Sequence, residues 1–209
     1  MIKGIIFDLD NCIFDTHSLG AHILAPILEP LLISDFSPEV KKEIQNALWT
    51  DSLEDMIDQY HVRMDVAEKM REAYRNLVVP EEDILATYGD EDCIVELTAK
   101  KYLVTSGYQK FQQSKIDRLG LQPLFDEILI DAQDKRAARK GKKKIFGEIL
   151  KTNKWDAHEV LVVGDNPRSE LGAAKEIGIA TIQTLRSGVE KWEGADHYIY
   201  SLNELGSFV

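Results

Sequence analysis

Two aspartates separated by one residue, Asp8 and Asp10, directly follow a short apolar run at residues 5–7. The run is too short for a helix and is rich in β-branched and aromatic side chains, which predicts a buried strand. Two carboxylates this close repel each other, so a cation or a shared proton is needed to hold them together. A buried strand that ends in acidic groups would place them at the edge of an α/β sheet where ligands bind.

Four further polar residues lie at or shortly after the ends of later apolar runs, and these are Thr105, Ser106, Lys140 and Asp165. In a parallel sheet, strand ends of this kind meet at one edge. Carboxylates from two strands would form a hard oxygen site of the kind that Mg²⁺ prefers. A hydroxyl group and a lysine beside it would supply hydrogen-bond donors for phosphate oxygens.

The spacing of apolar residues predicts two architectures in one chain. From about residue 89 onward strands alternate with helices, which is typical of a mostly parallel, Rossmann-like sheet with helices on both faces. Residues 16–88 show helical spacing and no strand pattern, as in a small helical bundle. We therefore expect an α/β core formed by residues 1–15 and 89–209, with a helical cap at residues 16–88 inserted after the first strand. The expected strands are 5–7, 103–105, 128–130, 160–163, 181–183 and 197–200, the core helices are 111–121, 145–150 and 171–177 with a short one near Leu202, and the cap helices are 19–31, 38–49, 53–60 and 66–77.

The composition excludes several classes of protein. The chain has 209 residues, 44% of them hydrophobic, and a formal charge of −11, which disfavours nucleic acid and anionic membranes as partners. No apolar stretch approaches the roughly 18 residues of a membrane span, and no signal peptide is evident. The two cysteines, Cys12 and Cys93, do not form a disulfide framework, so a cytoplasmic protein with reduced thiols is expected.

A basic run is the local exception to this acidic composition. Seven of the ten residues from 135 to 144 are Lys or Arg. A charge run is usually a solvated face. Because this run follows the expected third strand, we hypothesise that it attracts anionic substrate towards the edge of the sheet.

Four motifs in this sequence resemble those of the haloacid dehalogenase superfamily of phosphohydrolases, and they occur in the same order. The first is the Asp-x-Asp pair at residues 8–10, and the second is the strand that ends in Thr105-Ser106-Gly107. The third is a lysine five residues before an Ile-Phe pair, which Lys140 satisfies. The fourth is Gly-Asp at residues 164–165 followed by a second acid, Glu170. The long gap between the first and second motifs resembles members whose helical (C1-type) cap is inserted there.

This resemblance implies a role for each motif residue. Asp8 would be the nucleophile that forms an aspartyl-phosphate, and Asp10 would be the general acid and then the general base. Mg²⁺ would be held by Asp8, by the backbone carbonyl of Asp10 and by Asp165. The residues that would bind the phosphoryl oxygens are Thr105, Ser106 and Lys140, while Glu170 would act from behind on metal-bound waters or on the lysine.

The sequence departs from the family pattern at several positions. Asn11 stands where glycine is commonest, although asparagine tolerates positive φ. Cys12 replaces Thr or Val, and we expect it to pack inertly. Glu170 replaces the usual aspartate. Gly141 stands where proline is expected, and the lysines beyond it make Lys142 an alternative to Lys140.

The resemblance favours a Mg²⁺-dependent phosphatase that acts on a small phosphorylated metabolite, such as a sugar phosphate or a nucleotide monophosphate. Asp10 disfavours a dehalogenase, because it supplies the acid that phosphoryl chemistry needs. A phosphomutase of the same superfamily is one alternative. A catalytically silent phosphoester-binding or regulatory protein is another.

Overall fold

A six-stranded parallel sheet forms the centre of the computed structural model, which describes residues 1–48, 52–135 and 137–209. The strand order is β3-β2-β1-β4-β5-β6, and each pairing is parallel. The strands are β1 (Gly4–Phe7), β2 (Lys100–Gly107), β3 (Glu127–Ala132), β4 (Val160–Gly164), β5 (Ala180–Thr184) and β6 (His197–Ile199). The predicted mostly parallel α/β fold is therefore confirmed.

The strand β1 lies in the middle of the sheet, and its four residues are all buried. Its register pairs Phe7 with Leu103 of β2 on one side and with Val163 of β4 on the other. The chain adds β2 and β3 on one side of β1 and then crosses to add β4 on the other side. The strand order reverses between β1 and β4, and open α/β sheets bind ligands at such a switch point.

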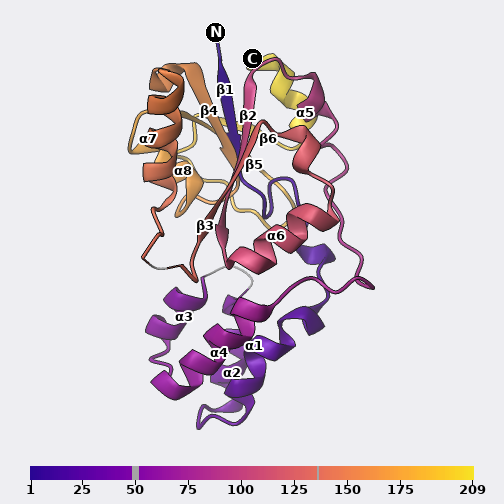
Figure 1. Ribbon diagram of the computed structural model, residues 1–209, viewed down its shortest axis with the longest axis vertical. Helices are drawn as coiled ribbons and strands as arrows, with labels where there is room; N and C mark the ends of the chain where they lie inside the picture. Colours follow the sequence, from indigo (N-terminus) through magenta and orange to yellow (C-terminus); the bar gives the residue numbers. More distant parts are fainter. Residues whose placement is uncertain (49–51, 136) are drawn as a thin grey trace.

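Helices cover both faces of the sheet (Figure 1). On one face lie α7 (Lys142–Asn153) and α8 (Glu170–Lys175), which pack on Ile6, Val104 and Val162. On the other face lie α6 (Gln109–Arg118), α5 (Cys93–Glu96) and the 3₁₀ helix Leu202–Ser207. Alternate residues of each strand thus point into separate cores, as the two-residue repeat of a strand requires.

The helical segment lies beyond the carboxyl ends of the strands (Figure 1). It begins with two 3₁₀ turns, Thr16–Ser18 and Ala21–Leu24, and its helices are α1 (Ala25–Leu32), α2 (Pro38–Ala47), α3 (Leu53–Gln59) and α4 (Met64–Asn76). Ser37 and Ser52 cap α2 and α3 by accepting a backbone N–H, which explains where both helices begin. The segment contacts α6, where the rings of Tyr74 and Tyr108 stack with centroids 4.1 Å apart.

Two chain crossings join the helical segment to the sheet. Asp15 N–H donates to the Ala86 carbonyl at 3.0 Å, and Tyr88 N–H donates to the Ile13 carbonyl at 3.1 Å. Close by, the buried Arg186 guanidinium binds the Cys12 carbonyl, at 2.8 Å from Nη2, and pairs with the Asp90 carboxylate through both terminal nitrogens. This ion pair fixes the loop after Asp10 to the point where the chain re-enters the core.

The structure differs from the expected elements in three places. The first cap helix, expected over 19–31, is split, because Gly20 is extended and the turn before α1 is 3₁₀. The four-residue α5 is too short to leave a periodic signal. The final helix is 3₁₀ throughout. Trp49, expected at the end of the second cap helix, and Arg136 of the basic run lie outside the described residues. Within the described part of the chain, no helix has the length and apolar character of a membrane span.

Candidate active site

Asp8 lies immediately after β1, and its backbone N–H donates to the Val163 carbonyl of β4 at 2.9 Å. Its carboxylate Oδ1 accepts a hydrogen bond from Lys142 Nζ at 2.8 Å. The same ammonium group donates to Glu170 Oε2, also at 2.8 Å. All three side chains are buried, so these are charge-assisted bonds within the protein interior. Lys142, the first residue of α7, therefore links Asp8 to the first residue of α8.

Asp165 completes an acidic cluster with Asp8 and Glu170, in which one ligand atom from each residue lies within 4.8 Å of the others. Burial raises the pKa of Asp8 to about 7 despite the opposing charge of Lys142. Burial, Glu170 and Asp8 raise the pKa of Asp165 to about 8. Burial opposes ionisation of Glu170 as well, but Lys142 holds its pKa below the ordinary value. Three carboxylates thus share one lysine, and a divalent cation fits this excess of negative charge and hard oxygen donors.

Steric crowding explains why residue 164, before Asp165, is a glycine. A Cβ atom on Gly164 would come within 2.4 Å of Glu170 Oε1. The carboxylate of Glu170 is also held by the Asn166 N–H, which donates to Oε1 at 2.6 Å. Both oxygens of Glu170 therefore have protein donors, whereas Asp165 directly follows β4 and is partly exposed. Asp8 and Asp165 are therefore suited to bind a cation directly, whereas Glu170 is suited to hold Lys142 in place.

Asp10 lies apart from this cluster and has its own partners. Its Oδ1 accepts from Lys115 Nζ at 2.6 Å, and its Oδ2 accepts from Gln112 Nε2 at 2.9 Å. Gln112 Nε2 also lies 2.5 Å from Thr105 Oγ1 and 3.2 Å from the Ser106 carbonyl. Thr105 is buried and Ser106 is partly exposed. The structure thus brings Asp10, Thr105 and Ser106 to one place, beside the amino-terminal half of α6.

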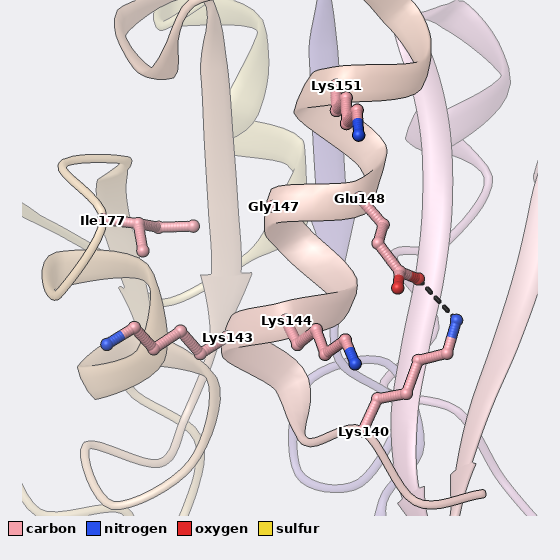
Figure 2. Close-up of a pocket in the computed structure, with 7 residues that line it drawn as sticks. All are labelled: Lys140, Lys143, Lys144, Gly147, Glu148, Lys151 and Ile177. Atoms are coloured by element: carbon pink, nitrogen blue, oxygen red, sulfur yellow. Dashed lines mark hydrogen bonds and ion pairs between the residues drawn. The ribbon is translucent and has the colours of Figure 1, made fainter.

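Lys140 is not brought to this site, contrary to the sequence expectation. Figure 2 shows Lys140 on the outer side of α7, where its Nζ pairs with Glu148 Oε2 at 2.6 Å and its side chain is 48% exposed. The buried Asp131 accepts from the backbone N–H groups of Lys140 and Gly141, both at 3.1 Å, and so fixes the turn. Lys142, the alternative, is the lysine that contacts Asp8.

The exposed lysines of the basic run surround a surface pocket of about 450 Å³ on α7 (Figure 2). It is lined by Lys140, Lys143, Lys144, Gly147, Glu148, Lys151 and Ile177. Lys143 pairs with Glu176 at 2.7 Å, and its side chain is more than half exposed. Lys140, Lys143 and Lys144 thus form a solvated basic face at the start of α7, whereas Lys142 turns inward.

The loop after Asp10 has the features expected for Asn11 and Cys12. Asn11 has a φ of 55°, the left-handed conformation that glycine adopts freely and asparagine tolerates. Cys12 is fully buried, and its thiol lies 3.6 Å from the Val163 carbonyl. Burial and then the negative charge of Asp8 raise the pKa of this thiol, so it stays protonated and unreactive.

Comparisons with known proteins agree with this fold and arrangement. The sequence profile of haloacid dehalogenase-like hydrolases matches residues 5–184, and the chain belongs to this family. The glyceraldehyde 3-phosphate phosphatase of Methanocaldococcus jannaschii is 25% identical over 228 aligned positions, which cover 100% of this chain and 96% of that protein. The prediction of a hydrolase of this superfamily is confirmed.

Solved structures share the fold over the full length. The haloacid dehalogenase-like hydrolase SP0104 of Streptococcus pneumoniae superposes with a TM-score of 0.72 at 16% identity, covering 100% of this chain and 99% of that one. The HAD-hydrolase YfnB of Bacillus subtilis, a magnesium-bound structure, has a TM-score of 0.65 at 18% identity, covering 99% and 98%. At these identities the likeness establishes the fold.

Sequence reasoning missed two residues of this site, Lys115 and Gln112. Both lie in α6, whose buried residues are Phe111, Gln112, Lys115 and Ile116. These positions form one stripe of the helix. Lys115 stands at helical spacing with the apolar residues of this stripe, and this spacing was the sequence signal that could have identified it.

Proposed function

We propose that this chain is a Mg²⁺-dependent phosphatase that hydrolyses a small phosphomonoester through an aspartyl-phosphate on Asp8. The observation that carries the proposal is the buried lysine on each aspartate: Lys142 binds Asp8, and Lys115 binds Asp10. Asp165 adds a third carboxylate beside Asp8. A fold has little reason to bury this much charge at one sheet edge, because desolvating each ion costs several kcal/mol, on the order of the whole stability of a domain.

Asp8 is placed to attack. Its carboxylate oxygen would form a bond to phosphorus as the bond from phosphorus to the leaving oxygen breaks. Lys142 keeps part of the negative charge of Asp8 and of the incoming phosphoryl group neutralised, and Glu170 fixes the lysine from behind. Mg²⁺, held by Asp8, Asp165 and the backbone carbonyl of Asp10, would supply further charge neutralisation when bound.

Asp10 is proposed as the proton carrier. It would give a proton to the leaving oxygen in the first step and take a proton from the water that hydrolyses the aspartyl-phosphate in the second. Thr105 and Ser106 lie beside it on β2 and would donate to the phosphoryl oxygens. In this proposal Lys142 replaces Lys140 as the phosphate-binding lysine, because Lys142 lies at Asp8.

We further propose that residues 16–88 act as a cap that contributes substrate contacts. Tyr74 of α4 supports this role, because it stacks on Tyr108 at the start of α6. Burial and the negative charge of Asp10 raise the pKa of the Tyr74 hydroxyl, which supports a position of α4 close to the proposed site. A substrate bound at Asp8 would therefore meet groups from the helical segment, and these would select it.

A small phosphorylated metabolite is the substrate class we propose, and the relative's name makes glyceraldehyde 3-phosphate the first compound to assay. The test is a phosphate-release screen over sugar phosphates, nucleotide monophosphates and phosphorylated acids, with and without Mg²⁺. We expect release that EDTA abolishes. The Asp8→Asn variant should lose it, whereas Asp35→Asn, at a side chain that is 97% exposed, should retain it.

Three results would contradict the proposal. The first is full activity in Asp8→Asn. The second is an isomerised phosphate ester, formed with a bisphosphate activator and without release of inorganic phosphate, which would indicate a phosphomutase. The third is binding of phosphoesters without turnover, which would indicate a silent regulatory protein.

A further inference from the structure

The carboxylate of Asp10 is held at both oxygens by one helix. Lys115 Nζ lies 2.6 Å from Oδ1, and Gln112 Nε2 lies 2.9 Å from Oδ2. The two donors come from positions three residues apart on α6, so they lie next to each other on one side of the helix. Two donors on two oxygens fix the plane of a carboxylate as well as its position.

Burying the Lys115 ammonium group carries a high desolvation cost. Lys115 is 3% exposed, and its ammonium group lies 4.9 Å from the ring centre of Phe111 and 5.5 Å from that of Phe14. A lysine this buried normally needs a paired charge, and Asp10 supplies it. Within the described residues, Lys115 and Lys142 are the two buried lysines, and each binds one of the two aspartates that follow β1.

Gln112 connects Asp10 to Thr105. A carboxylate only accepts hydrogen bonds, so the atom of Gln112 that faces Asp10 is the amide nitrogen. The same nitrogen lies 2.5 Å from Thr105 Oγ1, which therefore acts as the acceptor there. The hydroxyl proton of Thr105 is then free to point away from Gln112, towards a phosphoryl oxygen. One amide thus orients both the proton carrier and a phosphate-binding hydroxyl.

The adjoining side of α6 carries the helical segment. Tyr108 and Phe111 contact the Tyr74 ring, and Ser114 Oγ accepts the backbone N–H of Val79 at 3.0 Å. Arg118 Nη2 donates to the Asp83 carbonyl at 2.7 Å. The helix that positions Asp10 is therefore also the helix on which residues 64–83 rest.

We propose that Lys115 and Gln112 are positioning residues that aim the Asp10 carboxyl group at the leaving oxygen of the substrate. The inference rests on the proposed phosphatase function. As the bond from phosphorus to the leaving oxygen breaks, the proton of Asp10 moves to that oxygen, and the carboxylate that forms is stabilised by Lys115. In the second step water attacks phosphorus, its proton returns to Asp10, and the bond from Asp8 to phosphorus breaks.

The test is the leaving-group dependence of kcat/KM in Lys115→Met, with phenyl phosphate and 4-nitrophenyl phosphate as probes. These have similar shapes, but 4-nitrophenolate departs without needing a proton. General acid catalysis contributes about 10²–10⁴-fold, and misplacing rather than deleting the acid should forfeit about 10–100-fold with phenyl phosphate. With 4-nitrophenyl phosphate we expect a loss of less than about threefold, since little protonation is needed there.

Three further variants make the result interpretable. Lys115→Arg keeps the charge and should recover part of the loss with phenyl phosphate. Gln112→Leu should also lose more with phenyl phosphate than with 4-nitrophenyl phosphate, on top of a loss common to both substrates through Thr105, and it provides a second route if Lys115→Met does not fold. Lys110→Met, at an exposed position of the same helix, should retain the wild-type ratio of the two substrates.

Equal losses with both substrates would mean that Lys115 has only a structural role, and unchanged kinetics would mean that it has none in catalysis. Either result overturns this inference while leaving the proposed function intact, provided that the wild type is active and Asp8→Asn is not. If the wild type hydrolyses neither phosphate ester nor any compound of the metabolite screen, the proposed function fails first.

Discussion

Replacing Lys142 by methionine is the sharpest test of how this site is organised. Lys142 is buried and donates to Asp8 Oδ1 and Glu170 Oε2, both at 2.8 Å. Removing one partner of a buried pair costs about 3–5 kcal/mol, because the remaining charge is left uncompensated. At about 3 kcal/mol, a chain of this length should lose roughly 6–12 °C in Tm, at about 2–4 °C per kcal/mol.

The same change should reduce catalysis. Loss of one preorganised donor to the transferring group costs about 10²–10³-fold in kcat, or about 3–4 kcal/mol of transition-state stabilisation. Lys140→Met is the matched control. Its ion pair with Glu148 has side chains 48% and 44% exposed, and such surface pairs contribute about 0–1 kcal/mol. We therefore expect Lys140→Met to stay close to the wild type in kcat and in Tm.

Steady-state kinetics on the best substrate of the screen and calorimetric melting in EDTA measure both effects. Melting in EDTA separates the loss of the ion pair from any change in metal binding. The reasoning is refuted if Lys140→Met loses activity while Lys142→Met keeps it, because the phosphate-binding lysine would then be the one on the outer side of α7.

Three other changes test the proposed metal site, the buried Arg186–Asp90 ion pair and the basic face. Mg²⁺ should raise the wild-type Tm in calorimetry, and Asp165→Asn should remove most of this increase; an equal increase in the variant would exclude Asp165 as a ligand. Asp90→Asn should cost about 3 kcal/mol in urea unfolding, because it leaves the buried Arg186 unpaired. Burial alone would raise the pKa of Asp90, but hydrogen bonds from Arg186, the Leu202 N–H and the Ser201 hydroxyl, together with the charge of Arg186, lower it. The stabilisation by Asp90 is therefore present above about pH 4 and is lost as the pH falls, and Asp90→Asn should flatten this acid loss. Replacing Lys143 and Lys144 by glutamine should weaken the salt dependence of kcat/KM, and an unchanged dependence would show that this face does not attract substrate.

The fold was largely predictable because the strands of a parallel sheet are continuous apolar runs. Each expected strand overlaps an observed one, and the structure extends the second from 103–105 to Lys100–Gly107. Apart from Tyr102, the added residues are lysines, a serine and a glycine, and their strand conformation comes from pairing with β1 and β3 rather than from local preference. The break in the first expected cap helix could not be predicted, because the apolar residues keep helical spacing on both sides of it.

The carboxylates of the site were predictable from the same logic. Asp8, Asp10 and Asp165 each follow an apolar run, and a parallel sheet brings such positions together without any tertiary information. Lysines are harder to place, because a long flexible side chain on a helix reaches a site from a position that no strand end marks. The family spacing to Ile145-Phe146 selected Lys140, which the structure places outside.

The phase of the helix resolves this choice in physical terms. Lys142, Ile145, Phe146 and Ile149 are the buried residues of α7, at the spacing i, i+3, i+4 and i+7 of a single helical face. Lys140 precedes the helix, across a Gly141 with a φ of 77° that redirects the chain. Lys115 lies in the buried stripe of α6 in the same way. A lysine in phase with an apolar stripe must be buried, and a buried lysine needs a carboxylate. Applied to both helices, this rule pairs two lysines with the two aspartates after β1, while Lys140, Lys143 and Lys144 stay exposed.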